Sequence, residues 1–229
     1  MLRRRAPYLP DVFSGAQPIP TAVLPREVCM AWFTSLPDPT DLADVLRRFP
    51  VGWPALLDAH DSILRAPASL SIGERELIAA YVSALNACAF CTAAHTAYAE
   101  RYGVLPGVVD ALLDAPERAA VEAQLLPVLA YARSLTRSPE QAHRREVEAI
   151  RRAGWPEETV MEATMVVALF AFMNRIVLGM GVAPFAERYR DRLDAIRRLP
   201  VGRRLEANAR DVGTTPYREY GRSIGLIRD

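Results

Sequence analysis

Apolar residues recur at helical spacing along most of this 229-residue chain, and no sustained stretch alternates apolar with polar residues. Helical spacing gathers apolar side chains on one face of an α-helix, whereas a half-buried β-strand needs alternation. An apolar fraction of 51% is enough to build a hydrophobic core. The sequence therefore predicts an all-α fold.

Prolines, glycines and capping residues divide the chain into short helices. Ser71 and Glu74 form one capping box, and Ser138 with Gln141 forms a second. Gly103 is placed to end a helix in the left-handed conformation. Helices are expected over residues 24–36, 39–49, 52–65, 71–85, 88–103, 106–113, 117–135, 138–154, 156–179 and 184–198.

Three segments are expected along the chain. Residues 1–23 carry four prolines and are predicted to form an extended N-terminal arm. Residues 24–199 form the helical domain. Gly103 and Gly154 each precede a helix that begins at a proline, a weak internal repeat that two related helical halves would explain. The arginine-rich residues 200–229 are predicted to form a C-terminal arm that wraps a partner subunit.

Composition excludes several function classes. The chain has 28 basic and 27 acidic residues, a net charge of +1, so no strong field attracts nucleic acid or acidic lipid. It contains no lysine, which excludes lysine Schiff-base chemistry and the lysine-dependent phosphate-binding loop. The common hydrolase, dinucleotide and zinc-protease motifs are also absent.

The cysteine content and the first residues favour a cytoplasmic protein. Three cysteines are too few for a secreted disulfide scaffold, and residues 1–7 lack an apolar signal core. The most apolar run, residues 165–173, is too short to cross a membrane, so it is expected to be a buried helix.

The residues with the clearest chemistry lie between Glu76 and His95. Cys88 and Cys91 are spaced to close a small disulfide, and His95 follows Cys91 by one helical turn on the same face. A free thiol has a pKa of about 8.5, so a helix N-terminus and a nearby base are needed to favour the thiolate. Glu76 can orient His95 only if the chain turns near Asn86 and the two helices fold back on each other.

Residues 76–95 resemble the alkylhydroperoxidase AhpD-like family of the carboxymuconolactone decarboxylase-like superfamily, because the spacing Glu-x11-Cys-x2-Cys-x3-His matches throughout. The stretch 172–181, with Asn174 and Arg175, resembles the peroxidase-related branch, so the resemblance covers roughly residues 40–190. It implies an all-helical homo-oligomer that reduces hydroperoxides and needs no cofactor except an external thioredoxin-like or lipoyl-type dithiol.

Carried over from the family, Cys91 is the peroxidatic thiol and Cys88 the more exposed resolving thiol, with Glu76 and His95 as the proton relay. Thioredoxin-like logic would instead make Cys88 the nucleophile. The family's usual pattern has a second histidine immediately before the second cysteine, where this chain has Phe90. Four residues are candidates for lining a substrate pocket: His60, Tyr81, Phe90 and Tyr98.

Other interpretations of these residues remain open. Cys88, Cys91 and His95 could bind zinc with Glu76 or His60, although three ligands from so short a segment crowd tetrahedral geometry. The buried guanidinium expected at Arg175 favours a structural ion pair over substrate binding. The alternative functions are a lactone or acid enzyme of the decarboxylase type and a non-enzymatic redox-responsive oligomer.

Overall fold

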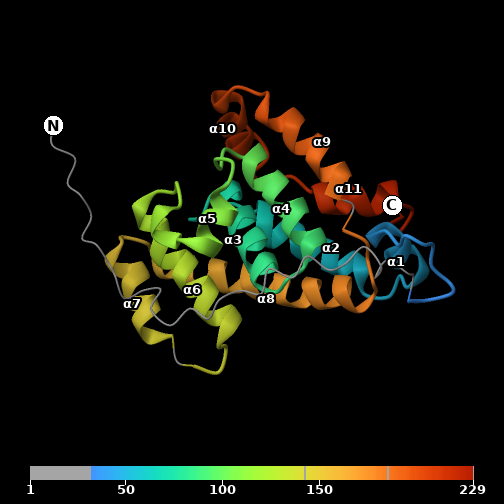
Figure 1. Cartoon of the computed structure of the whole chain (residues 1–229), viewed down its shortest axis with the longest axis horizontal. Coiled ribbons are helices and arrows are strands. Elements are labelled where there is room, and N and C mark those ends of the chain that lie inside the picture. The colour runs from blue at the N-terminus through green and yellow to red at the C-terminus, as the bar shows by residue number, and fades with distance from the viewer. Residues whose placement is uncertain (1–31, 142, 185, 229) are drawn as a thin grey trace.

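The computed structural model describes residues 32–141, 143–184 and 186–228, and these are all-helical, which confirms the predicted class (Figure 1). The helices of the described residues are α1 (Leu42–Arg48), α2 (Trp53–Arg65), α3 (Ile72–Leu85), α4 (Ala89–Arg101), α5 (Val108–Asp114), η2 (Pro116–Arg118), η3 (Ala123–Leu125), α6 (Leu126–Arg137), α7 (Arg144–Arg152), α8 (Glu157–Gly179), α9 (Ala186–Arg197), α10 (Val201–Arg210) and α11 (Pro216–Ser223).

Helix α3 lies at the centre of the core and contacts α2, α4, α5, α6 and α8. Its start is the predicted capping box: the Ser71 hydroxyl accepts from the Glu74 amide at 3.2 Å, and the Glu74 carboxylate accepts from the Ser71 amide at 2.7 Å. Nearly every α3 side chain is buried, so this helix is covered on all sides by its neighbours. A charged residue within it, such as Glu76, is therefore held away from water.

A tight turn at residues 86–88 reverses the chain between α3 and α4. Ala87 takes a left-handed backbone conformation, with φ of 56°. The two helices then pack along their length, and Gly73 permits the closest approach, because a Cβ there would lie 2.8 Å from the carbonyl oxygen of Tyr102. The predicted helix end at Gly103 is present, with φ of 101°.

Two predicted helix boundaries are wrong. Residues 117–135 do not form one helix: η2 and η3 are separated by extended residues, and α6 starts at Leu126, because Pro127 cannot donate within a helix but fits its first turn. The predicted start at Ser138 is a turn instead. Ser138 caps the end of α6, donating to the Ser134 carbonyl at 2.8 Å, and α7 begins at Arg144.

The predicted arms have different outcomes. The N-terminal arm, residues 1–23, lies outside the described residues, as do Cys29 and most of the expected helix 24–36, whose described end at 32–36 is a turn. The C-terminal segment is not an extended tail, because residues 201–210 and 216–223 form helices α10 and α11. A role of this segment in oligomer formation stays a prediction.

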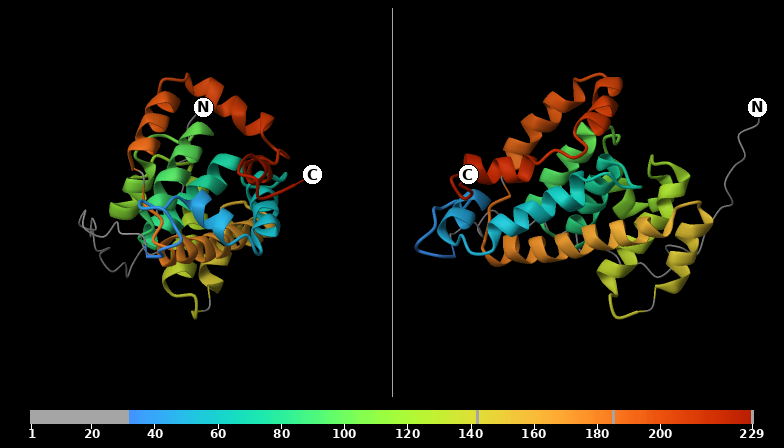
Figure 2. Two further views of the ribbon diagram at one scale, coloured as in Figure 1. Left: turned by 90° about the vertical axis from the view of Figure 1, so that its right-hand side faces the viewer. Right: turned by 180° about the vertical axis from the view of Figure 1, so that it is seen from behind.

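Helices α9, α10 and α11 arch back over the core from the end of α8 (Figure 2). Helix α9 packs on α4, and α11 packs on α2. The Asp61 carboxylate of α2 accepts from the first backbone amides of α11, Tyr217 at 3.0 Å and Arg218 at 2.8 Å, and thus caps that helix from a distance in sequence. The amide of Gly213 donates to the Arg65 carbonyl at 2.7 Å. The C-terminal segment thereby covers one end of the α2 and α4 pair.

Helix α8 is the longest helix of the described residues and runs beneath α3 and α4 in the view of Figure 1. Among the described residues it alone is long and apolar enough to cross a membrane by length and composition. One of its faces, including Val166 and Phe170, is buried against α3 and α6, which is the arrangement expected of a core helix.

Candidate active site

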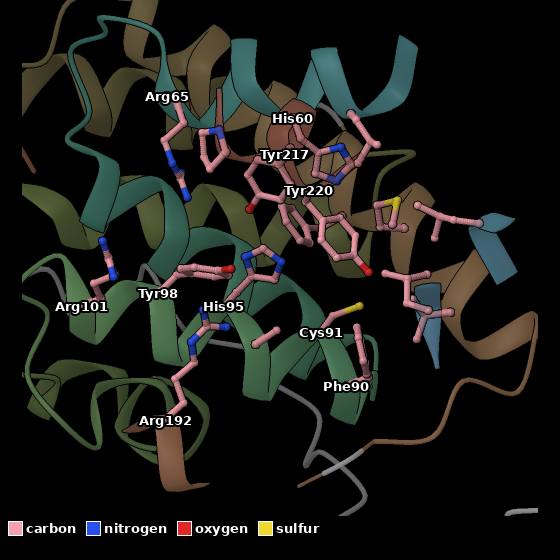
Figure 3. Close-up of a pocket in the computed structure, with 18 of the residues that line it drawn as sticks. His60, Arg65, Phe90, Cys91, His95, Tyr98, Arg101, Arg192, Tyr217 and Tyr220 are labelled. Carbon is pink, nitrogen blue, oxygen red and sulfur yellow. The ribbon is translucent and has the colours of Figure 1, made fainter. Parts of the chain in front are cut away.

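A cavity of about 520 Å³ lies between α2, α4, α8 and the C-terminal helices (Figure 3). His60, Phe90, Cys91, His95 and Tyr98 of the sequence-predicted set line it. Its other lining residues are Asp41, Leu42, Leu46, Trp53, Leu57, Arg65, Ala94, Arg101, Tyr102, Phe170, Met173, Val177, Arg192, Asp211, Pro216, Tyr217 and Tyr220.

The two thiols sit at the N-terminal end of α4. Cys88 is the N-cap residue and Cys91 lies in the first turn, so both are close to the positive end of the helix dipole. Both cysteines are free thiols. The expectation that Cys88 is the more exposed thiol is wrong: Cys88 is 0% exposed and Cys91 is 4% exposed, because α4 turns the Cys91 side chain towards the cavity.

The two thiols share a hydrogen bond that separates their acidities. The Cys91 thiol donates to Cys88, and this lowers the pKa of Cys88. The pKa of Cys91 is raised, first by the same hydrogen bond and then by burial. The Asn174 side chain also hydrogen-bonds to both sulfurs. This contact adds to the lowering of the Cys88 pKa and offsets a small part of the rise in the Cys91 pKa. The pair therefore carries its first negative charge on Cys88.

Asn174 is held in place by neighbours on α3 and on the turn that follows it. Its Nδ2 donates to the Ser83 hydroxyl at 3.0 Å, and its Oδ1 accepts from Asn86 at 2.9 Å. The neighbouring Arg175 is not the buried ion pair that we expected, because it faces outward on α8 and donates to the Ala171 carbonyl at 2.5 Å. The polar residue of this motif that reaches the site is thus Asn174.

Glu76 anchors His95 as the fold-back of α3 on α4 requires. Nδ1 of His95 donates to Oε2 of Glu76 at 2.6 Å, which leaves Nε2 as the free ring nitrogen. Oε1 of Glu76 forms an ion pair with Nη2 of Arg65 at 2.6 Å. Burial alone would raise the pKa of Glu76, but the charges of Arg65 and His95 and their hydrogen bonds lower it overall.

Arg65 sits among three tyrosine rings. Its guanidinium carbon lies 5.2 Å from the ring centre of Tyr102, 5.4 Å from that of Tyr217 and 5.9 Å from that of Tyr98. Such cation–π contacts favour a buried guanidinium. Burial would lower the pKa of Arg65, but Glu76 raises it overall, so Arg65 stays charged.

His60 reaches the cavity from α2. Its Nδ1 contacts the Leu56 carbonyl at 2.7 Å, and its ring lies 4.9 Å from the ring of Tyr217. Burial lowers the pKa of His60 to about 4, so the ring is neutral at pH 7. Neutral His60 with Nδ1 as the donor presents Nε2 as a hydrogen-bond acceptor.

The fourth predicted pocket residue, Tyr81, does not line the cavity. It points away from it on α3, is fully buried, and accepts a hydrogen bond from Arg133 at 3.1 Å. No group of three or more His, Cys, Asp and Glu side chains within the described residues is arranged to hold a metal ion. Glu76, one of the proposed zinc ligands, is engaged by Arg65 and His95 instead.

Sequence reasoning missed three residues of the site: Arg65, Asn174 in its contact with the sulfurs, and Tyr217. They come from α2, α8 and α11, far from the cysteines in sequence. The one sequence feature that indicated any of them was the polar pair Asn174-Arg175 in an otherwise apolar run.

The sequence model of the carboxymuconolactone decarboxylase family matches residues 52–134, which include α2, α3 and α4 with Glu76, both thiols and His95. This match and the solved structures described below support the assignment of the chain to the AhpD-like carboxymuconolactone decarboxylase superfamily. Among curated proteins, none matches the chain.

Two solved structures share the superfamily fold. One is the alkylhydroperoxidase AhpD core of an uncharacterized peroxidase-related protein from Ralstonia eutropha JMP134, with 26% identity and a TM-score of 0.59 over 64% of this chain and 77% of that chain. The other is an uncharacterized peroxidase-related protein from Silicibacter sp. TM1040, with 24% identity and a TM-score of 0.57 over 64% and 78%. The family match and the first of these structures support a peroxidase-related function in general terms.

Proposed function

We propose that this protein is a thiol peroxidase that reduces organic hydroperoxides with Cys88 and Cys91, and that an external dithiol restores the pair. The observation that carries the proposal is the shared location of two free thiols and of His95, whose other nitrogen is held by Glu76 at 2.6 Å. Peroxide reduction needs a thiolate rather than a thiol, and an anchored imidazole can accept the thiol proton.

In the first step, Cys91 attacks, because its sulfur faces the cavity and that of Cys88 does not. The first proton of the pair moves to Nε2 of His95, which leaves the negative charge on Cys88. The Cys91 proton then shifts along the hydrogen bond to Cys88, and the resulting Cys91 thiolate attacks the terminal oxygen of the hydroperoxide. The S–O bond forms as the O–O bond breaks, which gives a sulfenic acid on Cys91. The leaving alkoxide takes the proton from His95 and departs as the alcohol.

In the second step, Cys88 resolves the sulfenic acid. Its sulfur attacks that of Cys91, the disulfide forms, and one water is released. The hydrogen bond between the sulfurs favours this step, because it lowers the pKa of Cys88 and holds the two atoms together. A dithiol entering by the cavity then reduces the disulfide by exchange and becomes oxidised to its own disulfide.

Phe90 occupies the position immediately before the second cysteine, where the family's usual pattern has a second histidine. His60 lines the same cavity from α2. Phe90 supplies apolar lining next to Cys91 and contributes no acid or base. His95 is therefore the base nearest to the attacking thiol along α4, one helical turn from it. Substitution of His95 is expected to remove most of the proton-transfer contribution.

Steady-state reduction of cumene hydroperoxide with dihydrolipoamide as reductant tests the proposal. Cys91→Ser and Cys88→Ser are expected to abolish turnover, and His95→Gln to lower kcat roughly hundredfold. Cys29→Ser, which changes the third cysteine, is the matched control and should keep the wild-type rate. Turnover that survives loss of both thiols would overturn the peroxidase and favour lactone or acid chemistry instead.

A further inference from the structure

The Tyr217 hydroxyl is buried in the cavity without a hydrogen-bond partner among the described residues. Figure 3 shows the hydroxyl directed into the cavity, towards His95 and Tyr98. Burial raises the pKa of Tyr217 well above its usual value, so the phenol remains a proton donor at neutral pH. An unpaired buried donor is costly, and it is satisfied when a ligand supplies an acceptor.

Arg192 of α9 adds a cation to the same end of the cavity. Its guanidinium carbon lies 5.1 Å from the ring centre of Tyr98, and no carboxylate of the described residues lies within ion-pair distance of it. The other cations of this end are already engaged: Arg65 pairs with Glu76 at 2.6 Å, and Arg101 reaches Asp211 at 3.5 Å. Arg192 is thus the unbalanced charge among the lining residues at this end.

The opposite end of the cavity, beside Cys91, has apolar side chains in its lining. Phe90, Met173 and Val177 line it beside Cys91. Figure 3 shows Phe90 and Cys91 at one end, His95 between, and Tyr98 with Arg192 at the other. Cys91 and Tyr98 are seven residues apart on α4, which separates the two ends by about 10 Å.

We propose that the cavity selects hydroperoxides that also carry a carboxylate, with Arg192 and the Tyr217 hydroxyl holding the carboxylate while the hydroperoxide reaches Cys91. The spacing along α4 corresponds to a carbon chain of about eight atoms between the two groups. The chemistry at Cys91 rests on the proposed function, whereas carboxylate binding at Arg192 does not depend on it.

Matched hydroperoxides test the selectivity. The value of kcat/KM for 8-hydroperoxyoctanoate should exceed that for octyl hydroperoxide about tenfold, and 4-hydroperoxybutanoate should lose the advantage because it cannot span the cavity. Arg192→Gln should bring the ratio of the two octyl substrates to about one, while Arg203→Gln, on exposed α10, should leave it unchanged. Equal kcat/KM values in the wild type, or a preference that survives Arg192→Gln, would overturn the proposal.

Binding of octanoate, measured by calorimetry, tests the carboxylate site independently of the peroxidase activity. The Cys88→Ser/Cys91→Ser protein, which cannot react, should bind octanoate about tenfold more tightly than octanol. Tyr217→Phe should weaken octanoate binding about fivefold, and Arg192→Gln should remove the difference between the two ligands. Octanoate binding that needs Arg192, together with a wild-type protein that consumes no hydroperoxide, would support the carboxylate site and refute the peroxidase. Octanoate bound no more tightly than octanol would refute the site alone.

Discussion

The ion pair between Glu76 and Arg65 makes a large and testable contribution to stability. The two side chains are 0% and 1% exposed and their charged atoms lie 2.6 Å apart. Glu76→Gln keeps the size of the side chain but leaves the Arg65 guanidinium buried without a counter-charge, which costs about 3–5 kcal/mol. The glutamine oxygen still accepts one hydrogen bond, worth about 1 kcal/mol, so we expect a net loss of about 3 kcal/mol.

Urea unfolding followed by circular dichroism measures this loss. In a thermal unfolding experiment on a domain of this size, a loss of about 3 kcal/mol lowers Tm by roughly 6–12 °C. Glu206→Gln, which removes an exposed carboxylate, is the matched control and should cost less than about 0.5 kcal/mol. Adding Arg65→Met to Glu76→Gln should recover part of the loss, because no unpaired charge then remains.

The pH dependence of the Glu76→Gln effect follows from the pKa of Glu76. Because that pKa is lower in the folded protein than in the unfolded chain, the stabilisation is fully present above about pH 4.5. It is lost as the pH falls through the folded-state value. The difference between wild type and Glu76→Gln should therefore shrink on acidification below pH 4.5. The contribution assigned to the ion pair would be refuted if Glu76→Gln were as stable as wild type at pH 7, or if the stability difference between the two proteins grew on acidification.

Three further results are expected. His60 has a folded-state pKa of about 4 against 6.5 unfolded, so it costs stability as the pH falls from 6.5 to 4, up to about 3 kcal/mol, and His60→Gln should flatten the stability–pH curve there. Asn174→Leu should raise the pKa of Cys88, read from thiolate absorbance against pH, since it removes a hydrogen bond to the sulfur; an unchanged curve would contradict this contact. Phe172 is 50% exposed on α8, and Phe172→Glu should shift the predicted homo-oligomer towards monomer in sedimentation velocity; an unshifted oligomer would exclude this face as the contact.

The centre of the site could be predicted because its information is local. One short stretch, residues 71–95, contains the Ser71 cap, the turn near Asn86 and the one-turn spacing from Cys91 to His95. The geometric requirement that α3 and α4 fold back on each other then brought Glu76 to His95.

The rest of the site could not be predicted because it comes from distant segments. Arg65 ends α2, and Tyr217 begins a helix in a segment expected to wrap a partner subunit. Long-range contacts between a side chain and a distant backbone, such as the Asp61 cap of α11, leave no periodic pattern in the sequence. Exposure of the two thiols was misjudged for the same reason, since neighbours of Cys88 from other helices bury it.

Stoichiometric oxidation of the reduced protein tests the central claim most directly. The protein is treated briefly with one equivalent of cumene hydroperoxide, free thiols are alkylated, and peptides are mapped by mass. The account predicts one Cys88–Cys91 disulfide formed and one cumyl alcohol released for each hydroperoxide consumed. Two thiols that remain open to alkylation, with the hydroperoxide unconsumed, would contradict it.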